Sequence, residues 1–109
     1  MWADFMLRIL NENITDKYNR LKSKDLVGVY MIVFVKDSIL HRIKKVQSDN
    51  VKTGLGGKLG NKGAVIIKFF VDDSNLCFIN CHLESGSKNS LDRLRNISEI
   101  HQKVFNCDK

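Results

Sequence analysis

A block of glycine and lysine in the middle of the chain has the residue types that suit phosphate chemistry. Residues 53–63 read T-G-L-G-G-K-L-G-N-K-G and hold five of the seven glycines of the 109-residue chain. Glycine lets the backbone adopt positive φ and approach a ligand closely. Lys58 and Lys62 add positive charge beside the N–H groups, so a phosphate is the ligand that fits. A hairpin loop with solvated lysines would have the same composition.

The spacing within this glycine block excludes two common phosphate-binding loops. The P-loop pattern G-x-x-x-x-G-K-[ST] fails because Lys52 stands where its first glycine should be and Leu59 follows Lys58. The dinucleotide-binding pattern G-x-G-x-x-G fails from Gly54, because its last position is Leu59.

The segments after the block predict an antiparallel hairpin that brings a histidine next to it. Apolar strands are expected at Ala64–Val71 and Leu76–Leu83, and the polar cluster Asp72–Asn75 is typical of a turn. The glycine block precedes the first strand, and His82 lies at the end of the second. Because antiparallel pairing puts these two ends together, we expect the block and His82 to be neighbours.

Alternation along the second strand puts Asn80 and His82 on one face, after the apolar Leu76 and Phe78. A single histidine is more often a structural or surface residue than a catalyst. The position of His82 at the end of a buried strand, beside a block suited to phosphate, favours a functional role.

The two ends of the chain show helical periodicity. Apolar side chains recur at every third or fourth position in Trp2–Leu10 and in Leu91–Phe105, as on one face of a helix. Ser90 is the predicted N-cap of the second helix. From the residues alone, the chain is a mixed α/β protein with one antiparallel hairpin.

The segment before the basic region predicts one further apolar strand. Leu26–Val35 is nearly continuous in apolar residues, which predicts a strand buried on both faces, with Gly28 packed closely against a neighbour. Asn11–Lys24 is polar and is interpreted as a connection with a short strand near Tyr18–Leu21. Two helices cover only part of the three apolar strands, and no second sheet is expected from the rest. The chain alone is therefore predicted to be marginally stable, self-associating or partly molten.

Positive charge dominates the sequence. The formal net charge is +6, which favours an anionic partner such as phosphate, nucleic acid or an acidic membrane face. Residues 36–50 predict a short amphipathic turn or helix that leads to an edge strand, and they carry basic side chains at Lys36, His41, Arg42, Lys44 and Lys45. These side chains suit either a solvated surface or a patch that meets anionic lipid.

Cysteine usage and hydropathy favour a cytoplasmic chain. Cys77 and Cys81 lie four residues apart on a predicted strand, roughly 13 Å at ~3.3 Å per residue, which is too far for a disulfide. Reduced thiols fit an odd total of three cysteines. No stretch approaches the ~20 apolar residues of a membrane span, and the start of the sequence lacks a signal-peptide pattern. A peripheral position at the cytosolic membrane face is compatible with the charge.

Two segments carry a resemblance to a known family. Residues 51–65, V-K-T-G-L-G-G-K-L-G-N-K-G-A-V, and residues 76–83, L-C-F-I-N-C-H-L, resemble the inositol polyphosphate 5-phosphatases. The synaptojanin-like branch, with its "VKTG-x-GG-x-x-GNKGAV" block and "S-x-CFV-x-SH" strand, is the nearest. Trp2 and the L-V-G of residues 26–28 also match the family. The resemblance covers nearly all of this chain but only the middle of the family's catalytic domain.

This resemblance implies roles for individual residues. His82 matches the histidine that contacts the scissile phosphate, which implies a catalytic role, and Asn80 is expected to support it. The residues expected to bind substrate are Lys58, Asn61 and Lys62 of the glycine block and Arg93, which matches the arginine of the family's "ERN" segment.

The sequence departs from the family pattern at two positions near these residues. Glu84 stands where the family has a small alanine, and Leu94 follows Arg93 where the family has asparagine. A carboxylate beside a phosphate site repels the substrate unless it is turned away or paired.

The resemblance also implies a fold, a chemistry and an incomplete domain. The fold is a partial four-layer α/β sandwich of the DNase-I-like (endonuclease/exonuclease/phosphatase) type. The chemistry is Mg²⁺-dependent hydrolysis of a phosphomonoester on a phosphoinositide lipid or a soluble inositol polyphosphate. The family's "FQE", "GD-x-N-x-R" and "SDH" motifs, which supply metal contacts, the water-activating Asp and a second histidine, are not in residues 1–109. We therefore expect the chain to be the middle of the catalytic domain, without metal ligands and inactive alone.

Two other functions remain open. A non-catalytic module that binds anionic phosphoinositide headgroups fits the net charge of +6 and the missing motifs. A nuclease of the same superfamily fits less well, because it would not be expected to carry the "GNKGAV" block, and no nucleic-acid partner is expected.

Overall fold

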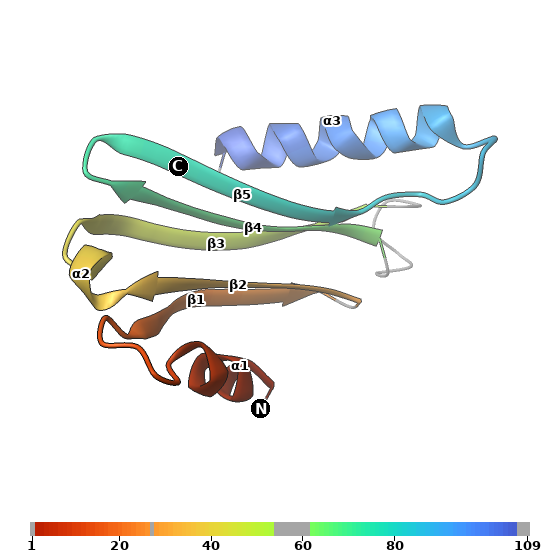
Figure 1. Cartoon of the computed structure of the whole chain (residues 1–109). Coiled ribbons are helices and arrows are strands. Elements are labelled where there is room, and N and C mark those ends of the chain that lie inside the picture. Colours follow the sequence, from red (N-terminus) through yellow and green to blue (C-terminus); the bar gives the residue numbers. More distant parts are fainter. Residues whose placement is uncertain (1, 27, 54–61, 107–109) are drawn as a thin grey trace.

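The elements of the chain lie in four layers, helix on sheet on sheet on helix (Figure 1). The computed structural model describes residues 2–26, 28–53 and 62–106. The first two layers are α1 (Trp2–Leu10) and the antiparallel pair β1 (Tyr18–Leu26) and β2 (Val29–Lys36). The other two are an antiparallel sheet in the order β3 (Ile43–Thr53), β4 (Lys62–Val71), β5 (Ser74–His82), and the covering helix α3 (Ser90–Asn106). The short helix α2 (Asp37–Leu40) joins the two sheets.

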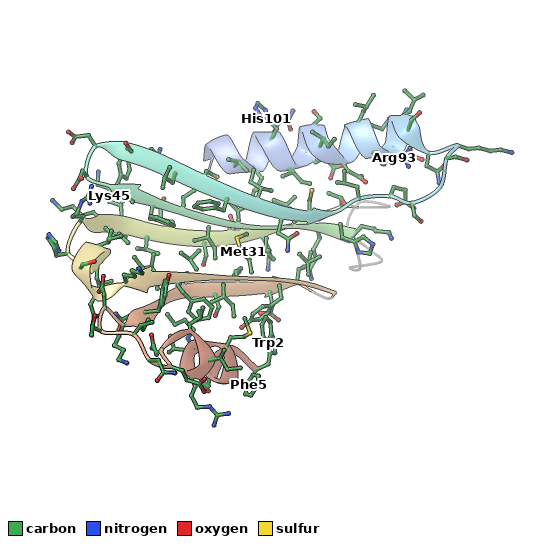
Figure 2. The ribbon with its side chains drawn as sticks, viewed as in Figure 1. Trp2, Phe5, Met31, Lys45, Arg93 and His101 are labelled. Atoms are coloured by element: carbon green, nitrogen blue, oxygen red, sulfur yellow. The ribbon has the colours of Figure 1, made fainter. Side chains whose placement is uncertain are left out.

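Strand β4 is the centre of the core, because its side chains are buried on both faces. Ala64 and Ile66 point to one side and pack with Ile100 and Val104 of α3. Val65 points to the other side and packs with residues of the β1–β2 hairpin, where Met31 extends toward it (Figure 2). The sequence predicted a strand buried on both faces at Leu26–Val35. The strand with this property is β4 instead.

The two-stranded sheet corrects the expectation that no second sheet could form. β1 runs well beyond the predicted Tyr18–Leu21, and it pairs with β2 from Tyr18↔Lys36 to Leu26↔Val29. The predicted strand Leu26–Val35 thus begins inside a hairpin turn. Gly28 has φ 80°, and no atom lies within 4 Å of the place where a Cβ would be. Its role is the turn's backbone geometry, and the predicted close packing is wrong.

The remaining elements follow the sequence closely. The helix at Trp2–Leu10, the antiparallel pairing of the hairpin and the edge strand after the basic segment are confirmed. The predicted cap at Ser90 is wrong by one residue, because the Arg93 N–H donates to the Asn89 carbonyl oxygen at 3.1 Å. That first helical bond makes Asn89 the N-cap. No helix within the described ranges is long and apolar enough to cross a membrane.

An ion pair joins the chain at the end of the sheet remote from the glycine block. The Arg42 Nη2 donates to Asp72 Oδ2 at 2.6 Å, and the Asp72 N–H donates to the Arg42 carbonyl oxygen at 3.0 Å. The start of β3 is thereby tied to the β4–β5 turn, where Asp72 has φ 53°. Hydrogen bonding to Arg42 lowers the pKa of the Asp72 carboxyl from its ordinary value of 3.8.

We expect this pair to make the melting temperature fall in acid. A carboxyl whose pKa is lower in the folded state contributes stability above its unfolded pKa, and that contribution is lost as the pH falls through the folded value. Melting temperatures measured from neutral pH to below 3.8 should therefore show a smaller acid loss for Asp72→Asn than for the wild type. Asp73→Asn, which removes a carboxylate outside the pair, is the control. Parallel curves for the wild type and Asp72→Asn would contradict this.

Candidate functional site

Strand pairing brings the end of the glycine block next to His82, as the sequence predicted. β4 begins at Lys62 and β5 ends at His82, and the register pairs Gly63 with His82. The Lys62 Nζ lies 3.1 Å from the His82 Nε2. Lys58 and Asn61 lie outside the described residues.

The short Lys62–His82 distance indicates which atom donates when the lysine is charged and the ring is neutral. An ammonium group has N–H donors and no acceptor. At 3.1 Å it therefore donates to the lone pair of Nε2, and a neutral His82 ring carries its proton on Nδ1. The other two N–H donors of Lys62 can bind an anion. The exposed pair thus offers positive charge next to a group that can accept or release a proton at Nε2.

Asn80 links the site to the other sheet. Its Nδ2 donates to the Tyr30 carbonyl oxygen of β2 at 3.0 Å, across the space between the sheets. This bond holds β5 two residues before His82. The role predicted for Asn80, support of His82, stays a prediction.

Arg93 and Asn96 hold the segment that follows His82. The Arg93 Nη1 donates to the carbonyl oxygens of Glu84 and Gly86, at 3.2 and 2.6 Å. Figure 2 shows Arg93 at the end of α3 that adjoins this segment. From the next turn of α3, the Oδ1 of Asn96 accepts the Glu84 N–H at 3.1 Å. The two α3 side chains thus fix the backbone on both sides of Glu84.

Sequence reasoning missed Asn96, which is only 5% exposed. The signal was its spacing, four residues before Ile100 and eight before Val104, on the face of α3 that packs on the sheet. A polar residue on a buried helix face needs a hydrogen-bond partner. Asn96 finds one in the backbone after β5.

Thr53 lies buried at the start of the glycine block. It pairs with Lys62 across β3 and β4 and is 0% exposed. Within the described part of the chain, its Oγ1 is the one buried side-chain polar atom without a hydrogen-bond partner. An unpaired buried hydroxyl costs roughly 1–3 kcal/mol. The first residue of the block is thus buried with its hydroxyl unpaired.

The described residues do not form a metal centre. Over residues 2–26, 28–53 and 62–106, no group of three or more His, Cys, Asp or Glu side chains is placed to hold a metal ion. Mg²⁺ requires several oxygen ligands in near-octahedral geometry. The donor set of the described residues does not fit that ion.

The layers are those of an endonuclease/exonuclease/phosphatase fold, and comparison with known proteins shows the family. A crystal structure of the inositol polyphosphate 5-phosphatase domain of a synaptojanin, in complex with inositol (1,4)-bisphosphate and calcium ion, matches with a TM-score of 0.82. That match has 40% sequence identity and covers 91% of this chain and 29% of the crystallised chain. The model of endonuclease/exonuclease/phosphatase family 2 matches residues 1–109. The chain belongs to this family.

Curated relatives confirm the resemblance to the 5-phosphatases. A probable inositol polyphosphate 5-phosphatase of Schizosaccharomyces pombe is 45% identical over 85 residues, which are 78% of this chain and 7% of the relative. Human synaptojanin-2 is 38% identical over 104 residues, which are 95% of this chain and 7% of the relative. The chain therefore spans a small part of the length of both relatives.

Proposed function

We propose that the chain is the part of an inositol polyphosphate 5-phosphatase domain that holds a phosphate of the substrate. The substrate is a phosphoinositide lipid or a soluble inositol polyphosphate. The observation that carries the proposal is the 3.1 Å approach of Lys62 to His82 at the end of the glycine block. The names of the relatives, and the inositol bisphosphate named with the matching crystal structure, support it.

In this proposal Lys62 and His82 bind the non-bridging oxygens of one phosphate. An entering phosphate accepts hydrogen bonds from the Lys62 ammonium. The Nε2 of His82, no longer hydrogen-bonded to Lys62, takes up a proton from solvent and becomes a second donor. Both donors then stabilise the charge that grows on those oxygens during hydrolysis. Lys58 and Asn61 are proposed to contact the same substrate. Arg93 is proposed as a positioning residue, because its guanidinium binds backbone oxygens of the segment after His82.

The proposed reaction requires more than these residues. The resemblance implies Mg²⁺, which polarises the phosphoryl group and stabilises the leaving oxygen when it is bound. The described residues supply no ligand set for it. We therefore propose that residues 1–109 form an incomplete catalytic domain, in which this chain binds and orients the phosphate.

Replacing Lys62 with glutamine is expected to weaken the binding of inositol (1,4)-bisphosphate about tenfold, because a charged hydrogen bond contributes roughly 1.5–3 kcal/mol. Replacing Lys58 as well should weaken it further. The free energy of unfolding should stay within about 1 kcal/mol of the wild type. Binding is measured by calorimetric titration at low salt, where screening is weakest. Lys22→Gln, which removes the same charge on β1, is the control, and equal affinities for it and Lys62→Gln would contradict the proposal.

We expect the chain alone to release no phosphate from 5-phosphorylated inositol lipids in the presence of Mg²⁺. The reason is the missing ligand set, together with the missing water-activating Asp and second histidine. Phosphate release is measured for the purified wild type and for His82→Ala. Equal rates of release from the two proteins would reveal a contaminating phosphatase. Turnover that disappears in His82→Ala would contradict the expectation.

A second function, binding of anionic headgroups without catalysis, is favoured by the basic side chains at the other end of the sheet. His41, Arg42, Lys44 and Lys45 are exposed where β3 begins, and Lys62 and His82 lie at the opposite strand ends. Such a module would sit at a cytosolic membrane face. Binding to phosphoinositide vesicles that depends on Lys44 and Lys45, and not on Lys62, would favour this second function.

A further inference from the structure

Glu84 is the acidic residue nearest to His82 in the sequence, and it stands where the family pattern has alanine. Side chains of α3 hold its backbone on both sides. Its N–H donates to Asn96 Oδ1 at 3.1 Å, and its carbonyl oxygen accepts from Arg93 Nη1 at 3.2 Å. Because hydrogen bonds are directional, these two contacts also fix the direction in which the Glu84 side chain leaves the backbone.

The packing of Leu83 places Glu84 on the same side of the chain as His82. Successive side chains point to opposite sides of an extended chain. Leu83 packs against the core cluster that includes Ile66 and Ile100, so its side chain is directed toward α3. His82 and Glu84, the residues before and after it, therefore lie on the other side. Their Cα atoms are roughly 7 Å apart at ~3.3 Å per residue.

Within the part of the chain that the structure describes, nothing neutralises the Glu84 carboxylate. Over residues 2–26, 28–53 and 62–106, this half-buried side chain makes no ion pair and no hydrogen bond. Glu84 thus brings a negative charge close to the phosphate that Lys62 and His82 are proposed to bind. A carboxylate accepts hydrogen bonds from hydroxyl groups and repels a second anion.

We infer that Glu84 selects substrates by the group on the ring carbon next to the bound phosphate. A hydroxyl on that carbon donates a hydrogen bond to the carboxylate, whereas a phosphate there meets its negative charge. The ligand class that fits is an inositol phosphate in which the bound phosphate has a hydroxyl neighbour on the side of Glu84. This inference rests on the proposed function, because it takes Lys62 and His82 as the site of one phosphate.

The test compares two probes that differ in this respect. In inositol (1,4)-bisphosphate each phosphate has hydroxyls on both neighbouring carbons, whereas inositol (1,4,5)-trisphosphate has phosphates on two neighbouring carbons. Calorimetric titration of the wild type should show no tighter binding of the trisphosphate, despite its greater charge. Glu84→Gln keeps the size of the side chain and removes its charge. It should tighten binding of the trisphosphate about tenfold and that of the bisphosphate less than about threefold.

The matched control is Glu99→Gln, which removes the same charge at an exposed position of α3. It should leave the ratio of the two dissociation constants unchanged. Glu84→Ala, which restores the residue of the family pattern, should change the ratio in the same direction as Glu84→Gln and serves if that variant fails to fold. Vesicles with phosphatidylinositol 5-phosphate or phosphatidylinositol 4,5-bisphosphate repeat the comparison for a lipid headgroup, and discrimination on either source supports the inference.

Equal effects of Glu84→Gln and Glu99→Gln on both sources would overturn the inference. If Lys62→Gln still weakened the binding of both probes, the proposed function would survive that result. If Lys62→Gln had no effect, or the wild type bound neither probe, the proposed function and this inference would both be wrong.

Discussion

Replacing Gly63 with alanine is expected to lower the free energy of unfolding by about 4 kcal/mol or more, a loss seen only when a single change disrupts the fold. An added Cβ would lie 2.0 Å from the Val51 carbonyl oxygen and 2.9 Å from the Leu26 Cδ2. The φ of 148° is also one that L side chains rarely adopt. Relief requires β3 and β4 to separate at the strand ends that hold the site. Denaturant unfolding measures the loss.

The control for this substitution is Gly28→Ala. Gly28 has a positive φ of 80°, but no atom lies within 4 Å of its Cβ position, so only backbone strain of about 1–3 kcal/mol is expected. If the two substitutions destabilised the protein equally, the close approach at Gly63 would not be the cause. Binding of inositol (1,4)-bisphosphate should also weaken in Gly63→Ala, because the same separation of β3 from β4 removes the support of Lys62, which pairs with Thr53.

Replacing Ile66 with alanine is expected to cost about 3 kcal/mol of unfolding free energy. Ile66 is 1% exposed and packs with Ile100 and Val104, so the truncation removes buried apolar surface and leaves a cavity between β4 and α3. The same denaturant titration measures it, and near-ultraviolet circular dichroism reports whether the remaining packing persists. Ile9→Ala, on the exposed side of α1, is the control, with an expected change within about 0.5 kcal/mol. A loss no greater than that of the control would show that α3 is not held by this cluster.

The sequence correctly predicted the elements whose apolar residues recur at an unbroken helical or strand period. It failed where the same residue types suit two different structures. Trp2–Leu10 has an apolar stripe that only a helix makes continuous, and the helix is present. The valines and glycine at residues 27–29 suit a strand interior as well as a turn, so the hairpin was missed. β1 was predicted too short because the polar run Lys22–Asp25 that continues it has no apolar alternation before Leu26. The resemblance, and not periodicity, supplied the four layers.

Sequence reasoning likewise predicted one part of the candidate site and missed another. The approach of Lys62 to His82 follows from antiparallel pairing, which a sequence can indicate. The contacts of Asn96 and Arg93 with the backbone around Glu84 depend on how α3 lies over the sheet. No local pattern encodes that placement, so Asn96 was not found, and the hydrogen bond from Asn80 to Tyr30 was missed for the same reason.

The Asn80–Tyr30 bond also limits how the two sheets can slide over each other. Apolar faces in contact resist separation, but they tolerate shear, because one aliphatic contact replaces another at little cost. A hydrogen bond is directional, and a slip of one residue, ~3.3 Å along a strand, would break it. His82, two residues beyond Asn80, thus takes its position partly from Tyr30, 50 residues before Asn80 in the chain. Substitutions in the β1–β2 hairpin that shift this sheet should therefore move His82, a proposed phosphate-binding residue, without touching it.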